Sequence, residues 1–381
     1  MHTAGTRPPN PTDLLTPRQL QEQVERLLHW LTTTVGTNHN HHHHHNHHHH
    51  PTNHNSITSR QILCLTGAGL STESGIPDYR GHQGSYHHGH QPMIHDQFMK
   101  SHAQRQRYWG RGMVGWRTFD EKQPSQGHYA LADLEQMGYL GVMFQDRDDF
   151  YNEHGHDVEP TTRTKVPGQR KLSIVTQNVD TFHRRAGTQH LIELHGRTDQ
   201  LKCMNCGAVR DRRSFHTELE SLNREWLQAA LAEADASDLR ADGDAEIKRG
   251  QYDSILIPSC TQCSDGFMKP DVVFFGDNVP VHRVAQCRAA VEACDGLLVV
   301  GSSLAVHSAF RHVRAAHERG VPIALLNVGE TRAEQEGLDN LLKIEAPAGP
   351  TLAAVAAHLA KAADTSSNPY SDGQRRAAVE N

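Results

Sequence analysis

The sequence predicts an α/β fold: a doubly wound parallel sheet covered by helices, with a smaller module inserted into it. Short runs rich in valine, isoleucine and leucine alternate with helical patterns, which is typical of a parallel sheet buried on both faces. A segment with two Cys-x-x-Cys pairs interrupts that alternation. The 381 residues leave room for one large domain or two medium ones.

The pattern places each expected element. We expect strands at 62–66, 172–177, 191–194, 272–275, 297–301 and 323–327, and helices at 125–137, 280–293, 306–319 and 351–362. Ligands of a doubly wound sheet gather at the carboxyl ends of its strands. Polar residues that directly follow a predicted strand are therefore the first candidates for a functional site.

An amphipathic helix is expected within residues 1–37. Thr16 is a capping residue, and Pro17 suits the first helical position. Apolar side chains then recur at helical spacing: Leu20, Val24, Leu27, Leu28 and Leu31. This stripe favours a helix packed on the body of the protein over one that enters a membrane or binds a partner helix.

Three further segments are expected to lie outside the packed core. The histidine- and asparagine-rich tract at 38–56 cannot bury apolar area, so we expect a disordered linker that binds metal only adventitiously. The polar residues 145–171 are expected to form a surface insertion. Residues 363–381 are expected to be a disordered tail.

Composition excludes two classes of partner. The formal net charge of -6 leaves no basic face, so we expect no nucleic-acid binding. No apolar run is long enough to span a bilayer, so we expect no membrane insertion. We also expect the protein to be a monomer. Arginines near the N-terminus are accompanied by acidic residues, which is a poor match to a transit peptide.

A glycine-rich turn follows the first predicted strand in "TGAGLSTESGIPDYRG", residues 66–81. Gly67, Ala68 and Gly69 supply a tight turn whose backbone N–H groups can approach a pyrophosphate. Thr72 stands where the dinucleotide fingerprint has its third glycine, which disfavours a dehydrogenase. A purely structural turn is the alternative.

The phrase "IPDYR" comes directly after that turn. Neither helix nor strand periodicity requires Asp78, Tyr79 and Arg80 at these positions. We interpret them as a loop that folds over a bound cofactor.

A second polar strand end contains Gln177, Asn178 and Asp180. Such amides and carboxylates can hold ribose hydroxyls or a carboxamide, although Asp180 can instead cap a helix. His195 closes the next strand, where a histidine can serve as a general base near neutral pH. His183 is the competing base, but its helical surroundings favour a surface or structural role.

Four cysteines form two closely spaced pairs, Cys203 with Cys206 and Cys260 with Cys263. In a long chain without a secretory signal, such pairs indicate metal ligands instead of disulfides. Four thiolates suit a tetrahedral, structural zinc site with no open position. We expect a zinc module at about 197–268 with an inserted helix at 214–239. The other cysteines are expected to be inert core residues: Cys64, Cys287 and Cys294.

Six motifs occur in one order: "GAGLSTESGIPDYR", "TQNVDTFHRRAG", "ELHG", "KPDVVFFGD", "VVGSSLAV" and "LNVG". Together with the paired cysteines, they resemble the sirtuin family of NAD-dependent protein deacylases. "QRYWGRGMVGW" and "QPSQGHYAL" make the chain most similar to class II members, the branch that includes mitochondrial sirtuins. The resemblance implies a Rossmann-like catalytic domain at 57–362 and a mitochondrial matrix location, with nucleus or cytoplasm as alternatives.

The resemblance also implies where NAD binds. The glycine turn would line the pyrophosphate, the "IPDYR" loop would cover the cofactor, and residues after later strands would hold the two nucleosides. At one implied contact, Ala348, family members often carry cysteine. The implied NAD-binding residues are Gly67, Ala68, Gly69, Asp78, Tyr79, Arg80, Gln177, Asn178, Val179, Asp180, Gly301, Ser302, Ser303, Asn327, Val328, Gly329 and Ala348.

In the family mechanism, the carbonyl oxygen of an acyl-lysine attacks the ribose carbon as nicotinamide leaves. The resemblance gives His195 the role of general base, with Asn178 and Asp180 as further catalytic residues. The expected substrates are acyl-lysine proteins, and the expected products are nicotinamide and O-acyl-ADP-ribose. A mono-ADP-ribosyltransferase or lipoamidase on the same fold is one alternative, and an inactive NAD- and zinc-binding scaffold is another.

The sequence leaves two alternative interpretations open for each of two motifs. "KPDVVFFGD" at 269–277 offers an edge strand that pairs with the substrate peptide, or a plain buried strand. Tyr108 and Arg111 resemble a Tyr-x-x-Arg pair that reads a carboxylate on the acyl chain in acid-preferring relatives. The same two residues can instead pack a helix.

Overall fold

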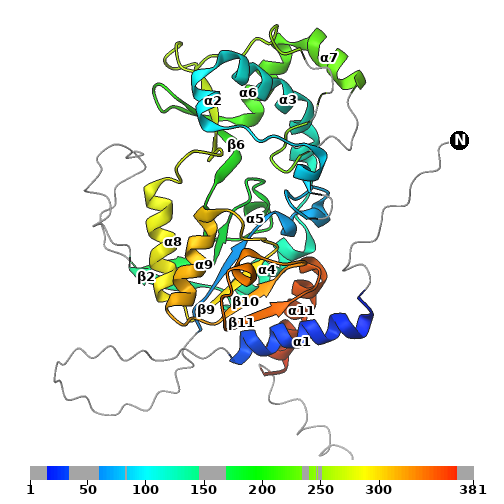
Figure 1. Cartoon of the computed structure of the whole chain (residues 1–381), viewed down its shortest axis with the longest axis vertical. Coiled ribbons are helices and arrows are strands. Elements are labelled where there is room, and N and C mark those ends of the chain that lie inside the picture. Colours follow the sequence, from blue (N-terminus) through cyan, green and yellow to red (C-terminus); the bar gives the residue numbers. More distant parts are fainter. Residues whose placement is uncertain are drawn as a thin grey trace, which may run out of the picture.

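The computed structural model describes residues 15–33, 60–81, 84–145, 169–233, 240–245, 247 and 251–366. Among these residues the largest sheet is parallel, six-stranded and ordered β11-β10-β9-β1-β4-β5 (Figure 1). Its strands are β1 (Ile62–Thr66), β4 (Ile174–Thr176), β5 (Leu191–Glu193), β9 (Gly296–Val300), β10 (Ile323–Leu326) and β11 (Leu341–Ile344). The predicted α/β class is confirmed.

Both faces of this sheet are buried, which explains why its strands are apolar without alternation. In β1, Ile62 and Cys64 join the core on one face, whereas Leu63 and Leu65 join the core on the other. The first face is covered by α1 (Pro17–Thr33), α4 (Gln126–Gln136) and α11 (Ala348–Ser366). The second face is covered by α8 (Val281–Ala293) and α9 (His307–Glu318).

The strand order reverses between β1 and β9. The chain first adds β4 and β5 on one side of β1, and later adds β9, β10 and β11 on the other. Thr66 and Val300 are in register at the carboxyl ends of the two central strands. In open α/β sheets, this reversal opens the crevice in which ligands bind.

A smaller lobe lies beyond the carboxyl end of the parallel sheet (Figure 1). Its sheet is antiparallel in the order β7-β6-β8. These strands are β6 (Gly196–Cys203), β7 (Val209–Asp211) and β8 (Met268–Val272), and the helices around them are α2 (His95–Lys100), α3 (His102–Glu121), α6 (Arg212–Leu222) and α7 (Arg224–Glu233). Helix α3 contributes Trp109, which packs on Phe215 of α6 with ring centroids 4.6 Å apart. The lobe is therefore built from two separate stretches of the chain, and the predicted single inserted helix is two helices.

Short elements complete the described fold. A hairpin joins β2 (Val142–Gln145) to β3 (Gln169–Leu172). The remaining helical turns are η2 (Ala68–Leu70), η3 (Thr72–Ser74), η4 (Ser85–His88), α5 (Phe182–Arg185) and α10 (Arg332–Gln335). Among the described helices, none has the length and apolar character needed to cross a bilayer.

Two predicted strands need correction. The strand predicted at 172–177 is divided, because Leu172 pairs antiparallel with Val142 and only Ile174–Thr176 joins the parallel sheet. The strand predicted at 272–275 is wrong except for Val272, which ends β8 of the antiparallel sheet. An apolar run alone cannot tell a parallel strand from the edge of another sheet.

The expectations for the segments between the elements have mixed outcomes. Helix α11 continues to Ser366, so the disordered tail is wrong for 363–366, because the helix that forms in the alanine-rich stretch at 353–363 extends through these residues. Gln145 and residues 169–171, the ends of the expected polar insertion, pair in the β2–β3 hairpin. Its remaining part, 146–168, lies outside the described residues, as do the histidine-rich tract at 38–56 and residues 367–381.

Candidate functional site

A cavity of about 2060 Å³ opens where the parallel strands end. A pocket for one small ligand typically measures about 300–1,000 Å³, so this cavity has room for a dinucleotide together with a second substrate. All seventeen residues implied to bind NAD line it, from Gly67 to Ala348, and so does His195. The structure thus brings these residues together, while the role of each stays a prediction.

The glycine turn packs directly on the end of β9. Gly67 donates its N–H to the carbonyl of Val300 at 3.0 Å, and Gly69 donates to that of Gly301 at 2.8 Å. A Cβ atom on Gly67 would lie 2.7 Å from the Cβ of Ser302. Glycine is therefore required at this turn for close packing, and these two amides are already engaged within the protein.

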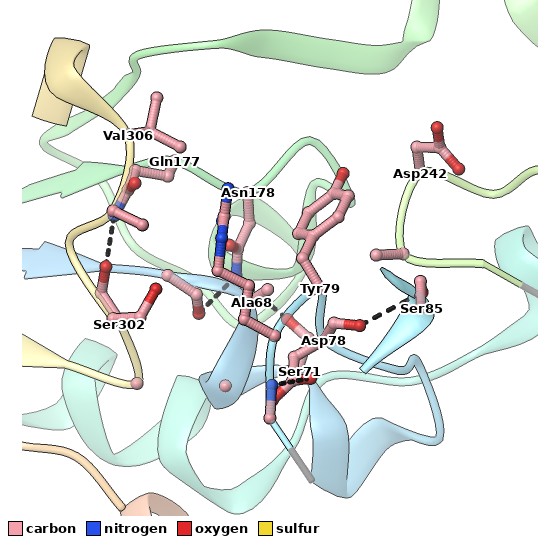
Figure 2. A pocket seen from close by; sticks show the side chains of 18 of the residues that line it. Ala68, Ser71, Asp78, Tyr79, Ser85, Gln177, Asn178, Asp242, Ser302 and Val306 are labelled. Atoms are coloured by element: carbon pink, nitrogen blue, oxygen red, sulfur yellow. Dashed lines mark hydrogen bonds between the residues drawn. The ribbon is translucent and has the colours of Figure 1, made fainter. Parts of the chain in front are cut away.

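The polar end of β4 is held by a hydrogen-bond network (Figure 2). Gln177 donates from Nε2 to Ser302 Oγ at 2.8 Å, which joins the ends of β4 and β9. Asn178 donates from Nδ2 to Ser71 Oγ at 3.1 Å, and Ser71 donates to Asp180 Oδ2 at 2.6 Å. Burial raises the pKa of Asp180, although the Ser71 hydroxyl opposes that rise. Side chains from three strand ends are thus fixed relative to one another at the cavity wall.

Asp180 also does what its alternative interpretation predicted. Its Oδ1 accepts the backbone N–H of Phe182 at 3.0 Å, at the start of α5. Because the carboxylate has two oxygens, this cap and the Ser71 bond coexist. Asp180 can therefore cap α5 and line the cavity at the same time.

The loop that follows the glycine turn is folded onto itself. Tyr79 lies 5.6 Å from the Tyr86 ring, and Tyr86 stacks on His90 at 6.3 Å. The backbone carbonyl of Asp78 accepts a hydrogen bond from Ser85 Oγ at 3.1 Å (Figure 2). The Arg80 guanidinium lies over the Tyr86 ring. The predicted cover loop therefore has an ordered aromatic centre beside the cavity.

The insertion between the two cysteine pairs reaches the cavity, which the sequence did not predict. Arg240, Ala241 and Asp242 line the cavity wall, and Figure 2 shows Asp242 on the opposite side of the view from Gln177. Asp242 Oδ2 lies 3.6 Å from Nε2 of His90. This contact has no local sequence signal, because it depends on how a distant loop folds back.

The Tyr-x-x-Arg pair is divided between two environments. Tyr108 lines the cavity, whereas Arg111 does not. Arg111 is 3% exposed and forms an ion pair with Asp244 across 3.0 Å. Burial raises the pKa of Asp244 to about 7, although the Arg111 charge opposes that rise. The geometry favours the helix-packing interpretation for Arg111.

His195 lies between β5 and β6 and is held on both sides of its ring. Nδ1 is 3.1 Å from the carbonyl oxygen of Gln177, and Nε2 is 2.7 Å from Ser308 Oγ. Burial lowers the pKa of His195 to about 4, and the charges of Arg283 and Arg311 add to that effect. The ring is therefore neutral near pH 7, as a general base must be.

His183, the competing base, does not line the cavity. It is 1% exposed, and its Nε2 is 2.9 Å from the Thr66 hydroxyl beneath the site. Burial lowers its pKa to about 3. Its position is that of a structural histidine.

The segment after β8 forms another part of the wall. Val273 donates its N–H to the His195 carbonyl at 2.9 Å, so this segment is attached to the residue that carries the imidazole. Phe274 and Phe275 line the cavity, and Phe275 forms a parallel bridge with Ile94. The segment forms an apolar wall. Part of one of its backbone edges already pairs with residues 94 and 95.

The four paired cysteines meet in the smaller lobe, away from the cavity. Their sulfur atoms all lie within 4.8 Å of one another, and the Cys203–Cys263 and Cys206–Cys260 pairs are each separated by 3.7 Å. A tetrahedron with zinc–sulfur bonds of about 2.3 Å has edges of about 3.8 Å, so the cluster fits zinc. The distances are far too long for disulfide bonds of about 2.05 Å.

The chain is similar to known proteins over most of its length. The model of the Sir2 family matches residues 67–159 and 162–308. An NAD-dependent protein deacetylase of Bradyrhizobium diazoefficiens is 41% identical over 72% of this chain and 86% of its own length. An NAD-dependent protein deacylase of Arabidopsis thaliana is 39% identical over 72% of this chain and 68% of its own.

Solved structures have the same fold. A Sir2 enzyme structure matches with a TM-score of 0.54 and 25% identity, over 80% of this chain and 94% of that one. A mutant Sir2 homologue in complex with ADP-ribose matches with a TM-score of 0.55 and 24% identity, over 81% and 94% of the two chains.

Proposed function

Because this chain belongs to the Sir2 family, we propose that it is an NAD-dependent protein-lysine deacylase that releases nicotinamide and O-acyl-ADP-ribose. The main observation that supports this proposal is the order in which polar residues follow the strands of the parallel sheet. Asn327 follows β10, Ser302 follows β9, Gly67 follows β1, Gln177 follows β4 and His195 follows β5. These strands are neighbours in that same order, so the residues form one line across the sheet.

This line suits an extended dinucleotide. We assign the adenosine to the end with Asn327 and Gly329, and the adenosine-side phosphate and ribose to Ser302 and Ser303. The pyrophosphate lies at the switch point between β1 and β9, where phosphates bind in related α/β sheets. The nicotinamide half then falls beside Gln177, Asn178 and Asp180, within reach of the wall that carries His195. Every residue in this assignment lines the same cavity.

The bound dinucleotide supplies a glycosidic bond whose cleavage frees nicotinamide and leaves a ribose that accepts the acyl group. The residues of the chain supply orientation and one basic site. His195 is neutral at physiological pH because burial lowers its pKa to about 4. In this role it withdraws the ribose hydroxyl proton, a contribution typically worth about 10²–10⁴ in rate.

The zinc cluster has a structural role in this proposal. Four thiolates occupy all four coordination positions of a tetrahedral zinc ion, so no position remains for water or substrate. Cys203 ends β6 and Cys260 lies before β8, so the ion would join the two ends of the insertion. Holding these ends together keeps the smaller lobe folded above the cavity.

Acyl-lysine peptides have an apolar wall available. Met93, Tyr108, Phe274 and Phe275 all line the cavity on the side of the smaller lobe. Such side chains suit the aliphatic stem of lysine and its acyl group. The shape of this apolar wall therefore determines which acyl chain the protein accepts best.

The proposal is tested with a panel of acyl-lysine peptides incubated with NAD and followed by mass spectrometry. We expect nicotinamide release that depends on the peptide, together with deacylated peptide and free O-acyl-ADP-ribose. ADP-ribose attached to protein would instead indicate a mono-ADP-ribosyltransferase, and preferential release of lipoate a lipoamidase. An absence of NAD turnover with every peptide would identify a scaffold and overturn the proposal.

We propose further that the chain belongs to class II of the family and acts in the mitochondrial matrix. The support is the motif "QRYWGRGMVGW", which lies in α3 and is mostly buried there. Fractionation of cells that express the tagged full chain tests the location. Recovery of the intact protein outside mitochondria would contradict it.

A further inference from the structure

Ser308 contacts the imidazole that the proposed function uses as its base. The serine lies in the first turn of α9 and lines the cavity. Its Oγ is 2.7 Å from Nε2 of His195. The other ring nitrogen, Nδ1, lies 3.1 Å from the backbone carbonyl of Gln177.

The two partners settle which nitrogen is basic. A backbone carbonyl can only accept, so Nδ1 must carry the hydrogen and donate it to Gln177. In a neutral imidazole the second nitrogen then has a single lone pair and no hydrogen. Nε2 of His195 is therefore the acceptor, and Ser308 donates its O–H to it.

This arrangement leaves no free lone pair on the base. The only lone pair of Nε2 is used by the Ser308 hydroxyl, so a ribose hydroxyl cannot reach it while that bond exists. The Ser308 oxygen, however, keeps lone pairs that can accept a hydrogen bond from a ligand. A proton that leaves a ligand in the cavity can thus reach His195 through Ser308.

We propose that Ser308 is a catalytic relay between the ribose hydroxyl and His195. The ribose O–H gives its proton to Ser308 Oγ while Ser308 gives its own proton to Nε2. The ribose oxygen keeps the electron pair of its broken O–H bond and forms the new C–O bond to the acyl carbon, whose C=N π bond breaks as its electron pair moves to the lysine nitrogen. Ser308 ends neutral, and His195 ends as the imidazolium.

The surroundings of the ring show why such a relay matters. Charge on His195 is opposed by burial and by the positive charges of Arg283 and Arg311. After the transfer, Nδ1–H still donates to Gln177, and the new Nε2–H donates to Ser308 Oγ. Hydrogen bonds from a charged donor are roughly twice as strong as neutral ones, so both partners stabilise the imidazolium.

The inference rests on the proposed function, and its test separates the two. In that function, nicotinamide leaves before the base acts, so reversal of the first step returns labelled nicotinamide to NAD. Ser308→Ala should slow deacylation about 10- to 100-fold, the loss expected for one hydrogen bond to a charged group. Exchange of labelled nicotinamide into NAD, in the presence of acetyl-peptide, should stay at the wild-type rate or rise.

Matched variants exclude a merely structural effect. Ser308→Thr keeps the hydroxyl and should restore most of the deacylation rate. His307→Ala changes the exposed neighbour on the same turn, which does not line the cavity, and should leave both rates unchanged. In a His195→Ala background, Ser308→Ala should cause no further loss, because residues that act as one unit are not additive.

The outcomes are distinct. A wild-type protein without peptide-dependent nicotinamide release contradicts the proposed function itself. An active wild type with an equally active Ser308→Ala variant overturns the relay, because the ribose hydroxyl then reaches His195 directly. A parallel fall of exchange and deacylation in Ser308→Ala also overturns it, since the serine would then support the fold or NAD binding.

Discussion

Arg111 and Asp244 form an ion pair across 3.0 Å that is almost completely withdrawn from solvent. The arginine comes from α3 and the aspartate from the insertion between the cysteine pairs, so the contact joins two distant stretches of the smaller lobe. Asp242, two residues earlier on the same loop, lines the cavity and approaches His90. The pair therefore supports a loop that reaches the proposed substrate site.

Removal of one partner should destabilise the protein. Arg111→Met leaves Asp244 buried without its cation, which typically costs about 3–5 kcal/mol in the free energy of unfolding. Urea unfolding measures the loss. The double variant Arg111→Met/Asp244→Leu should recover most of it, because the uncompensated charge is gone.

The same variant tests the role that its motif suggested in acyl recognition. Because Arg111 does not line the cavity, the ratio of succinyl- to acetyl-peptide turnover should be unchanged in Arg111→Met. A selective loss of succinyl-peptide turnover would restore the carboxylate-reading interpretation. A stable Arg111→Met variant would contradict the buried-pair account.

His195→Tyr should abolish deacylation while the protein still folds and binds NAD. The loss expected for a general base is about 10²–10⁴ in rate. Isothermal titration calorimetry measures NAD binding and thermal unfolding measures stability, alongside the turnover assay. His183→Gln is the matched control, since His183 is buried beneath the site and does not line the cavity. It should lower thermal stability and keep turnover, and the reverse pattern would move the base to His183.

The pH profile should show no loss of activity near the ordinary histidine pKa. Burial lowers the pKa of His195 to about 4, so its neutral, active form persists as the pH falls through 6.5. The acid limb of kcat/KM should therefore lie well below pH 6, measured over times shorter than any acid unfolding. An inflection close to 6.5 that is absent from a stability profile would contradict the burial of this ring.

Zinc removal should unfold the smaller lobe. Cys206→Ser removes one of four ligands that lie within 4.8 Å of one another, and we expect loss of bound zinc, lower thermal stability and loss of deacylation as a consequence. Metal analysis and near-UV circular dichroism measure the first two effects. Cys287→Ala, which changes a buried residue of α8 that is not part of the cysteine cluster, should keep its zinc. A chelated, metal-free protein with unchanged structure and activity would argue against a structural ion.

The parallel sheet was largely predictable from the sequence, because its strands are buried on both faces. Such strands must be apolar throughout, and Ile62–Thr66, Gly296–Val300 and Ile323–Leu326 all show that signal. The glycine turn and the polar residues after the strands were predictable for the same reason, since strand ends define the place of a site. The zinc cluster followed from cysteine spacing alone.

The smaller lobe was harder to predict. Strand β6 has alternating burial and a mixed polar sequence, and its partner β8 is distant in the chain. Such pairing is decided by tertiary packing, which local periodicity does not contain. Ser308 and Asp242 were missed for a related reason: each reaches the cavity through the approach of a separate element, and nothing beside it in the sequence marks that approach.

The most direct test of the account is the stoichiometry of one reaction. Purified full-length protein is incubated with NAD and an acyl-lysine peptide that it accepts, and nicotinamide, deacylated peptide and O-acyl-ADP-ribose are quantified together. The account predicts equal amounts of all three, with no deacylated peptide and no O-acyl-ADP-ribose formed by His195→Tyr. Deacylated peptide that appears without NAD, or nicotinamide that appears without deacylated peptide, would contradict it.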